Sequence, residues 1–90
     1  MELKIRPDAQ RFLRTVPPGP KKAMRAAMAE LATDPYAEKL DLKRLRHDAE
    51  LPLYRCRIGS FRIVFATLPT HVEVVRIFHR RDGYGWLERL

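Results

Sequence analysis

One short stretch of this 90-residue chain decides the fold: Leu53-Tyr54-Arg55-Cys56-Arg57-Ile58-Gly59-Ser60-Phe61-Arg62-Ile63-Val64-Phe65-Ala66. Two runs rich in β-branched and aromatic residues flank a Gly-Ser pair. This pattern is typical of a β-hairpin with a two-residue turn and glycine at its first position. The turn predicts four facing pairs: Ile58 with Phe61, Arg57 with Arg62, Cys56 with Ile63, and Tyr54 with Phe65.

The two faces of the predicted hairpin differ sharply, because side chains alternate along a strand. One face presents apolar side chains that suit a core: Tyr54, Cys56, Ile58, Phe61, Ile63 and Phe65. The other presents Arg55, Arg57 and Arg62, with Arg57 opposite Arg62. Like charges in this position destabilise a sheet by a few tenths to about 1 kcal/mol. No acid lies between Leu51 and His71 to relieve them, so this face indicates an anion-binding surface.

Two helices and two further strands are predicted around the hairpin. Residues 2–6 predict a strand, and Asp8 is the expected N-cap of a helix over residues 9–16. A second helix over residues 20–33 has a buried face of small and flexible side chains: Ala23, Met24, Ala27, Met28 and Leu31. Residues 36–52 predict a connector, and residues 72–79 a third strand of the meander, apolar on both sides.

The predicted order is therefore β-α-α-β-β-β, an α+β fold. Two N-terminal helices pack on one face of a roughly four-stranded, mainly antiparallel sheet. The other face is expected to be open and lined by arginines. We expect one domain over residues 1–90, because a chain of this length leaves no room for a second.

Composition bounds the function. The net charge of +7 favours a polyanionic partner, and every basic residue from Leu51 onward is an arginine, whose planar fork matches phosphate. No apolar run is long enough to cross a bilayer and no secretory signal opens the chain, so we expect a cytoplasmic location and no membrane partner. The single cysteine, Cys56, excludes an internal disulfide, and His47, His71 and His79 lack metal-ligand spacing. We expect no metal and no other cofactor.

Three segments of the chain resemble the RelE/ParE superfamily of toxins from type II toxin–antitoxin systems. Residues 54–65 resemble the central hairpin motif of that family, Y-R-x-R-h-G-x-[YF]-R-h-h-[YF], in which h is apolar. Leu42-Lys43-Arg44-Leu45 resembles its L-K-x-L element, and His79-Arg80-Arg81-Asp82-Gly83-Tyr84 resembles its H-R-R-[DE]-x-Y ending. RelE-type members cut messenger RNA, typically in the ribosomal A site, and ParE-type members poison DNA gyrase. The ending resembles the RelE branch more closely.

The resemblance implies roles for individual residues. Arg55, Arg57, Arg62 and Arg81 fall on positions that carry basic catalytic residues in RelE-like toxins. It implies that Arg62 contacts the scissile phosphate, that Arg81 faces the leaving oxygen, and that Tyr84 stacks on a nucleotide. Further RNA-binding candidates are basic residues near these motifs: Lys43, Arg44, Arg46 and Arg80. The implied partners are messenger RNA, the ribosome and a cognate antitoxin with an acidic tail and a DNA-binding domain.

A general base is harder to assign from the sequence, because arginine does not lose its proton under ordinary conditions. His79, Glu73 or no residue at all would serve, with electrostatics then acting alone. If the Pro69-Thr70 turn keeps a two-residue register, Glu73 and His79 lie on the arginine face, whereas a one-residue bulge reverses this. Trp86 either stacks on a base or packs on the domain. Alternative functions are a gyrase poison and a non-catalytic RNA-binding module.

Overall fold

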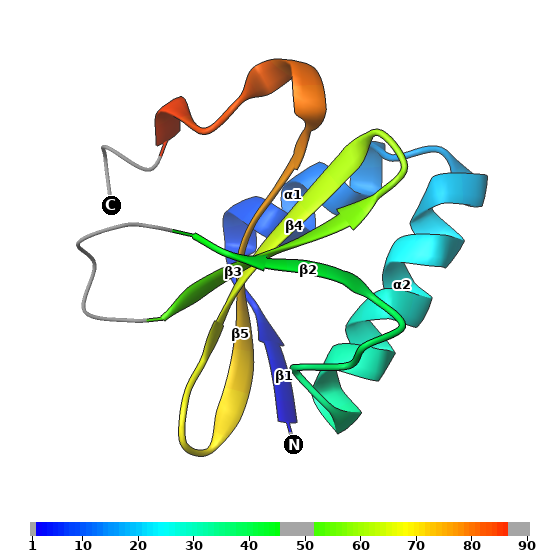
Figure 1. The fold of residues 1–90 in the computed structure, drawn as a ribbon. Helices are drawn as coiled ribbons and strands as arrows, with labels where there is room; N and C mark the ends of the chain where they lie inside the picture. The colour runs from blue at the N-terminus through cyan, green and yellow to red at the C-terminus, as the bar shows by residue number, and fades with distance from the viewer. Residues whose placement is uncertain (1, 46–51, 87–90) are drawn as a thin grey trace.

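A five-stranded mixed sheet with two helices on one face forms the described part of the computed structural model, which covers residues 2–45 and 52–86 (Figure 1). The elements in chain order are β1 (Glu2–Ile5), α1 (Pro7–Thr15), α2 (Pro18–Thr33), β2 (Asp41–Arg44), β3 (Leu53–Ile58), β4 (Phe61–Thr67), β5 (His71–His79) and a 3-10 turn (Arg80–Asp82). The strands lie in the order β1-β5-β4-β3-β2. Only the β1–β5 pairing is parallel among these strands. The predicted α+β architecture is confirmed, with one strand more than expected.

The additional strand is β2, which lies in the segment predicted as a connector. It pairs antiparallel with β3 and forms an edge of the sheet, with Leu42 as its only apolar residue. A four-residue edge strand with one half-buried side chain has no alternating pattern long enough to read from sequence. Pairing with β3 nevertheless gives its backbone groups partners on one side, and this pairing brings the polar side chains of β2 next to the hairpin.

Both helices begin at a proline, earlier than predicted. Pro7 opens α1 with Arg6 as the preceding residue, so Asp8 lies in the first turn and is not the N-cap. Pro18 opens α2, two residues before the predicted start. Proline suits this position because the first N–H groups of a helix have no intrahelical acceptor. Across residues 2–45 and 52–86, neither helix has the length and apolar character that a membrane crossing requires.

The β3–β4 hairpin has the predicted register. Arg57 pairs with Arg62, Cys56 with Ile63, and the Gly59-Ser60 turn closes the two strands. Gly59 has a φ of +56°, in the left-handed region that a residue without Cβ adopts at little cost. The sequence therefore located the turn and the facing pairs correctly.

A bulge in β5 changes which side chains reach the arginine face. The Pro69-Thr70 turn keeps the expected register, and the Leu68 N–H donates to the His71 carbonyl over 2.9 Å. Further along, the pairing shifts between Val64 and Phe65 of β4, so that one residue of β5 is skipped. After this point, the β5 side chains that the two-residue register would place on the arginine face lie on the helix side instead. The register therefore holds only for the part of β5 that precedes the shift.

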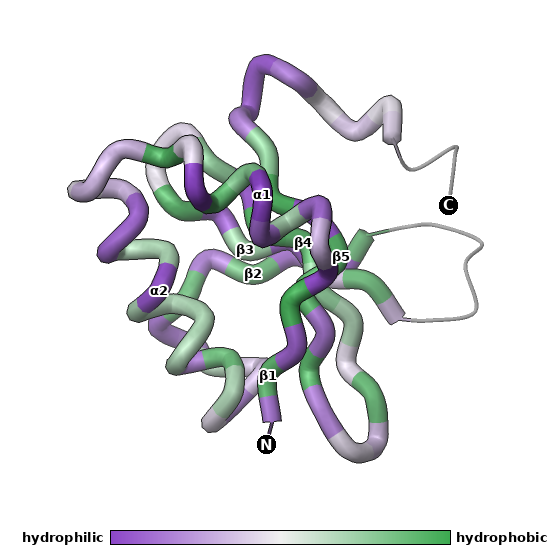
Figure 2. Tube along the Cα trace, turned by 180° about the vertical axis from the view of Figure 1, so that it is seen from behind, coloured by the Kyte–Doolittle hydropathy of each residue, from purple (hydrophilic) through white to green (hydrophobic). Residues whose placement is uncertain are grey.

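Two apolar clusters cover opposite faces of the sheet. Beneath the helices lies the main core, whose largest fully buried side chains include Phe65, Met24, Leu31 and Ile63. Figure 2, viewed from behind, shows α1 lying over the sheet with α2 beside it. A second cluster lies on the far face: Leu53, Val64, Ala66, Val75 and Phe78, with Leu45 and Trp86 packed against it. The expectation that this face is open throughout was wrong, because apolar side chains cover part of it.

The buried stripe of α2 is close to that predicted from its spacing. Met24, Ala27, Met28 and Leu31 are buried, whereas Ala23 is exposed. Burial of the flexible methionines against β-strand side chains fills the space between helix and sheet. The helices thus cover one face of the sheet, and the arginine side chains of the β3–β4 hairpin lie on the opposite face.

Candidate nucleic-acid interface

Four basic side chains share the face of the sheet that points away from the helices, at its β2–β3–β4 end. Lys43 of β2 pairs with Arg55 of β3, and Arg57 of β3 pairs with Arg62 of β4. Both pairs oppose like charges across strands, which costs up to about 1 kcal/mol each. This part of the sheet therefore carries a concentration of positive charge that its folding does not require.

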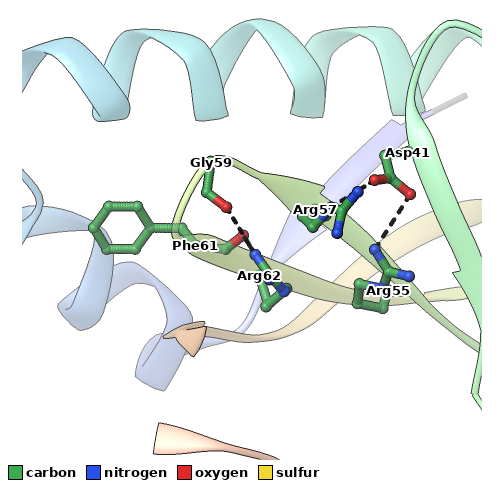
Figure 3. Close-up of polar contacts among 6 residues, drawn as sticks. All are labelled: Asp41, Arg55, Arg57, Gly59, Phe61 and Arg62. Carbon is green, nitrogen blue, oxygen red and sulfur yellow. Dashed lines mark hydrogen bonds and ion pairs between the residues drawn. The ribbon is translucent and has the colours of Figure 1, made fainter. Parts of the chain in front are cut away.

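One carboxylate relieves part of this charge. Asp41 of β2 accepts from Arg55 Nη1 at 3.3 Å and from Arg57 Nε at 2.6 Å, so that its two oxygens join the two arginines (Figure 3). Asp41 lies opposite Arg57 in the strand register. This contact was not predicted from the sequence, because Asp41 precedes the hairpin and lies on a strand that was not expected. The Asp41-x-Lys43 spacing, once placed on a strand, would have put both charges on this face.

The three arginines are held in different ways. Arg62 Nη1 donates to the carbonyls of Gly59 and Phe61, at 2.9 Å each, which ties its guanidinium to the turn (Figure 3). The Arg55 side chain is only 14% exposed, whereas that of Arg57 is 56% exposed. A ligand approaching from solvent therefore meets Arg57 before Arg55, and meets Arg62 in a fixed position.

These basic residues line a shallow hollow that the C-terminal segment completes. Its volume is about 220 Å³, and its lining consists of Lys43, Leu45, Arg55, Arg57, Arg62 and Tyr84. Tyr84 arrives from beyond the 3-10 turn and contacts Phe78 edge-to-face, with ring centroids 5.0 Å apart. An aromatic ring beside several guanidinium groups is the combination that binds single-stranded nucleic acid, through base stacking and phosphate contacts.

A larger hollow lies elsewhere, between α1 and the C-terminal segment. Its volume is about 620 Å³, and its lining includes Asp8, Arg11, Arg76, Asp82 and Trp86. Here the charges are matched, because Asp8 pairs with Arg11 and lies 3.8 Å from Arg76. The excess of positive charge therefore marks the smaller hollow as the candidate anion site.

Comparison with known proteins gives this arrangement a family. Residues 3–84 match the family described as "ParE toxin of type II toxin-antitoxin system, parDE". The chain belongs to this family of toxins. It is also 36% identical over 73 residues, 79% of each chain, to a protein of Methanocaldococcus jannaschii named "Putative toxin RelE1".

Solved structures agree with the fold of the toxin. The RelE–RelB complex of Pyrococcus horikoshii OT3 matches with a TM-score of 0.75 at 22% identity, covering 88% of this chain and 93% of that chain. The RelB–RelE antitoxin–toxin complex of Methanococcus jannaschii matches with a TM-score of 0.76 at 21% identity, covering 92% and 96%. At these identities the likeness establishes a RelE-like fold.

The C-terminal arginines of the toxin lie near the hairpin tip. The Arg80 N–H donates to the Ser60 carbonyl over 2.8 Å, which ties the 3-10 turn to the β3–β4 hairpin. Arg81 is exposed, and its N–H donates to His79 Nδ1 over 3.2 Å. Neither side chain is part of the lining of the hollow in the described residues, although Tyr84 just beyond them is.

His79 and Glu73, the two candidate general bases, lie away from the three arginines of the hollow. His79 pairs with Phe61, its ring 5.3 Å from the Phe61 ring, so the bulge places it on the helix side of the sheet. Of the two positions that the sequence left open for His79, the structure thus has the one on the helix side, and the bulge lies within the strand pairing and not in the Pro69-Thr70 turn. Glu73 accepts from Arg6 Nη2 at 3.1 Å and pairs with Ala66, toward the opposite end of the sheet.

The remaining RNA-binding candidates have different positions. Lys43 lines the hollow, whereas Arg44 pairs with Tyr54, with its Cζ 5.9 Å from the centroid of that ring and on the helix side. Arg46 lies outside the described residues. Of the three candidates within the described residues, the structure thus brings Lys43 alone to the arginine group.

Trp86 packs on the domain. Its ring contacts Phe78 at a centroid distance of 5.8 Å, and Arg76 Cζ lies 5.7 Å from the Trp86 ring. Its Nε1 is buried without a hydrogen-bond partner in the described structure. Phe78 touches both Tyr84 and Trp86, so one buried side chain anchors the whole aromatic end of the toxin.

Cys56 has no role in the hollow. Its side chain is fully buried beneath the helices. Burial raises the pKa of the thiol from 9.0 to about 11, and the nearby Asp41 carboxylate adds to the effect. A protonated, buried thiol is a poor nucleophile, which agrees with its predicted structural role.

Proposed function

We propose that this toxin is a metal-independent endoribonuclease that cleaves messenger RNA, on the ribosome, and thereby inhibits translation. The observation that carries the proposal is the convergence of Arg55, Arg57, Arg62 and Tyr84 on one hollow. Guanidinium groups bind phosphate in a bidentate manner and keep their charge at any physiological pH. The 36% identity to a protein named as a RelE toxin supports the same branch of the family.

The proposed reaction is an attack of a ribose 2′-oxygen on the adjacent phosphorus. The bond from phosphorus to the 5′-oxygen breaks, which leaves a 2′,3′-cyclic phosphate and a 5′-hydroxyl. Negative charge accumulates on the phosphoryl oxygens in the transition state, and donors held in place stabilise it most. In our proposal Arg62, fixed by two carbonyls, contacts this phosphate, and the more exposed Arg57 and the sheltered Arg55 add charge.

The other roles follow from position along the C-terminal segment. Tyr84, already in the hollow, stacks on a nucleotide base. Arg81 lies three residues before Tyr84 and is exposed beside the hairpin tip, where we assign it to the leaving 5′-oxygen. Because His79 and Glu73 contact other groups away from the arginines, the proposal gives them no proton-transfer step. The 2′-hydroxyl proton passes to water, the leaving 5′-oxygen takes a proton from water, and charge stabilisation supplies the rate enhancement.

The proposed regulation involves a cognate antitoxin in the same cytoplasm. Three solved relatives of the fold are toxin–antitoxin complexes. We propose that this toxin binds an antitoxin with an acidic segment and a DNA-binding domain. A segment of this kind would reach the basic hollow and block RNA, since both ligands are polyanionic.

Expression in cells tests the proposal. Induction of the wild-type chain is expected to halt growth and translation, with new 5′ ends mapped on messenger RNA. Arg62→Ala or Arg81→Ala should restore growth and remove the new ends. Arg14→Ala, which removes an exposed arginine from α1 on the helix side, should behave as wild type. Normal growth with the wild-type chain, or arrest that persists in Arg62→Ala, would contradict the proposal.

A gyrase poison is the second candidate, because the matching family is described by its ParE toxin. That function predicts a DNA-damage response and stalled gyrase complexes, while messenger RNA stays intact. A non-catalytic RNA-binding module predicts salt-dependent RNA binding without cleavage, even on ribosomes. Mapping of RNA ends separates both from the ribonuclease.

A further inference from the structure

Two arginines that line the hollow, Arg55 and Arg57, already bind an anion, the carboxylate of Asp41, which is not itself part of the lining. We infer that Asp41 occupies a phosphate subsite between Arg55 and Arg57, and that an RNA phosphodiester must displace it to bind there. The inference deepens the proposed function, on which it rests. Its ligand class is a backbone phosphodiester of single-stranded RNA.

The geometry of the contacts is that of a bound anion. One carboxylate oxygen accepts from Arg55 Nη1 and the other from Arg57 Nε, at 3.3 and 2.6 Å (Figure 3). A phosphodiester also presents two unesterified oxygens to guanidinium groups. Asp41 thus takes the donors that a phosphate would use.

The exposure of these groups makes displacement feasible. The side chain of Asp41 is 43% exposed and that of Arg57 is 56% exposed, whereas that of Arg55 is 14% exposed. The exposed Asp41–Arg57 ion pair contributes little to the stability of the fold. An incoming phosphodiester can therefore replace Asp41 at Arg57 at small cost, and the more sheltered Arg55 is the second donor.

Arg62 provides the contrast within the same hollow. Its guanidinium donates to two backbone carbonyls, and among the ion pairs of the described residues it has no carboxylate partner. The hollow therefore has one subsite that is open to phosphate at once, at Arg62, and one that opens only when Asp41 leaves.

The inference differs from two other roles for Asp41. A proton acceptor or a residue that only positions the arginines would be needed for function, so its removal would weaken binding or cleavage. A displaced anion acts in the opposite direction, because its removal strengthens RNA binding. The direction of the effect therefore decides between them.

The experiment measures binding of a fluorescent 2′-O-methyl RNA oligonucleotide by fluorescence anisotropy at several salt concentrations. This RNA has no free 2′-hydroxyl and is not cleaved. Asp41→Asn is expected to lower Kd by about three- to fivefold at low salt, within the range that loss of an exposed ion pair allows. The plot of log K against log salt should steepen by roughly 0.7, the value for one additional phosphate contact on a single strand.

The matched control is Glu30→Gln. It changes the net charge by the same amount and breaks one ion pair, with Lys39 at 3.1 Å, but lies on α2 away from the hollow. Its Kd should stay within about twofold of wild type. A gain as large as that of Asp41→Asn would mean that overall charge is responsible, and would overturn the inference.

Two further variants complete the test. In an Arg57→Gln background, Asp41→Asn should give less than half of its gain, because one of the two donors is gone. Asp41→Ser, with its fold checked by circular dichroism, should reproduce the gain of Asp41→Asn. Unchanged or weaker binding in both folded Asp41 variants overturns the inference. Tighter binding by Asp41→Asn without cleavage of ribosome-bound messenger RNA by any variant supports the subsite and contradicts the proposed ribonuclease.

Discussion

The sheet face opposite the helices has two halves that differ in kind. Toward the Gly59-Ser60 turn it carries Arg55, Arg57 and Arg62 around a hollow. Farther along it carries a buried apolar cluster that the Leu45 and Trp86 side chains cover: Leu53, Val64, Ala66, Val75 and Phe78. Arg62 and Phe78 are direct neighbours across β4 and β5, so the boundary falls between adjacent side chains.

The two halves of this face have different roles: the apolar half stabilises the fold, and the basic half is suited to binding an anion. The apolar half removes surface from water, which is the main source of stability. The basic half opposes like charges and leaves them near solvent, which stabilises nothing in the free toxin. Residues that break a local rule of folding are expected at functional sites. The comparison therefore predicts opposite consequences for substitutions on the two sides of the boundary.

Truncation in the apolar half should give the largest effect on stability. Phe78 is 4% exposed and anchors both Tyr84 and Trp86. Phe78→Ala is expected to lower the free energy of unfolding by about 3–5 kcal/mol, because it removes a buried ring and leaves a cavity. Urea denaturation measures this change, and Phe78→Leu should lose much less. A loss below about 1 kcal/mol would show that the second cluster is not a core.

Truncation in the basic half should remove activity with little change in stability. Arg62→Ala is expected to slow RNA cleavage about 100- to 1,000-fold, as the loss of one preorganised charge-stabilising donor does elsewhere. Its free energy of unfolding should change by less than about 1 kcal/mol. Single-turnover cleavage and urea denaturation of the same preparation give both numbers, with Arg14→Ala as the control. Equal losses of cleavage in both variants would remove the distinction between the halves.

Trp86 packs on Phe78 at the boundary between the two halves and holds the C-terminal segment there. Trp86→Ala should release Tyr84 from the hollow and weaken binding of a 2′-O-methyl RNA oligonucleotide about five- to tenfold, the cost of one lost stacking contact. Trp86→Phe, which keeps a ring on Phe78, should bind within about twofold of wild type.

A double variant shows whether Trp86 acts through Tyr84. Adding Trp86→Ala to Tyr84→Ala should weaken binding no further, because the same contact is already lost. Additive losses would mean that Trp86 touches RNA itself.

The last expected effect is absent near neutral pH and concerns Cys56 in the main core. Burial raises the pKa of Cys56 to about 11 from 9.0. Between these values the unfolded chain loses the thiol proton and the folded chain keeps it. The stabilising contribution of the protonated thiol is therefore complete below pH 9 and declines as the pH rises toward 11, by about 2 kcal/mol.

The matched variant isolates this contribution. Cys56→Ala retains every other ionisable group of the chain, so the difference in unfolding free energy between the two proteins reports Cys56 alone. As the pH rises, the free energy of unfolding of the wild type should fall relative to that of Cys56→Ala. A constant difference across the range would contradict a buried thiol.

Much of this architecture was predictable, because the decisive signals are local. The Gly59-Ser60 turn and its flanking alternation fix the hairpin register without any distant contact. The spacing of the buried residues of α2 likewise reflects a 3.6-residue period. Helix starts were less certain, since Pro7 and Pro18 fit the first turn as well as they fit a preceding loop.

The remaining features depend on contacts distant in sequence. β2 has a single apolar residue and becomes a strand only by pairing with β3, so the contact of Asp41 with the arginines was not visible. The bulge that moves His79 to the helix side lies in a strand that is apolar on both faces, where alternation gives no register. The arginines of the site were predicted, whereas their counter-ion and the position of the histidine were not.

The chemistry of the cleaved RNA ends is the sharpest test of the proposed ribonuclease activity. Purified toxin is incubated with ribosomes programmed with a defined messenger RNA, and the fragment ends are analysed. The account predicts 5′-hydroxyl and 2′,3′-cyclic phosphate ends. It also predicts no cleavage where a single 2′-deoxynucleotide replaces the nucleotide before the cut, and no cleavage by Arg62→Ala. Intact messenger RNA with active wild-type toxin, or cleavage that persists at the 2′-deoxynucleotide, would contradict it.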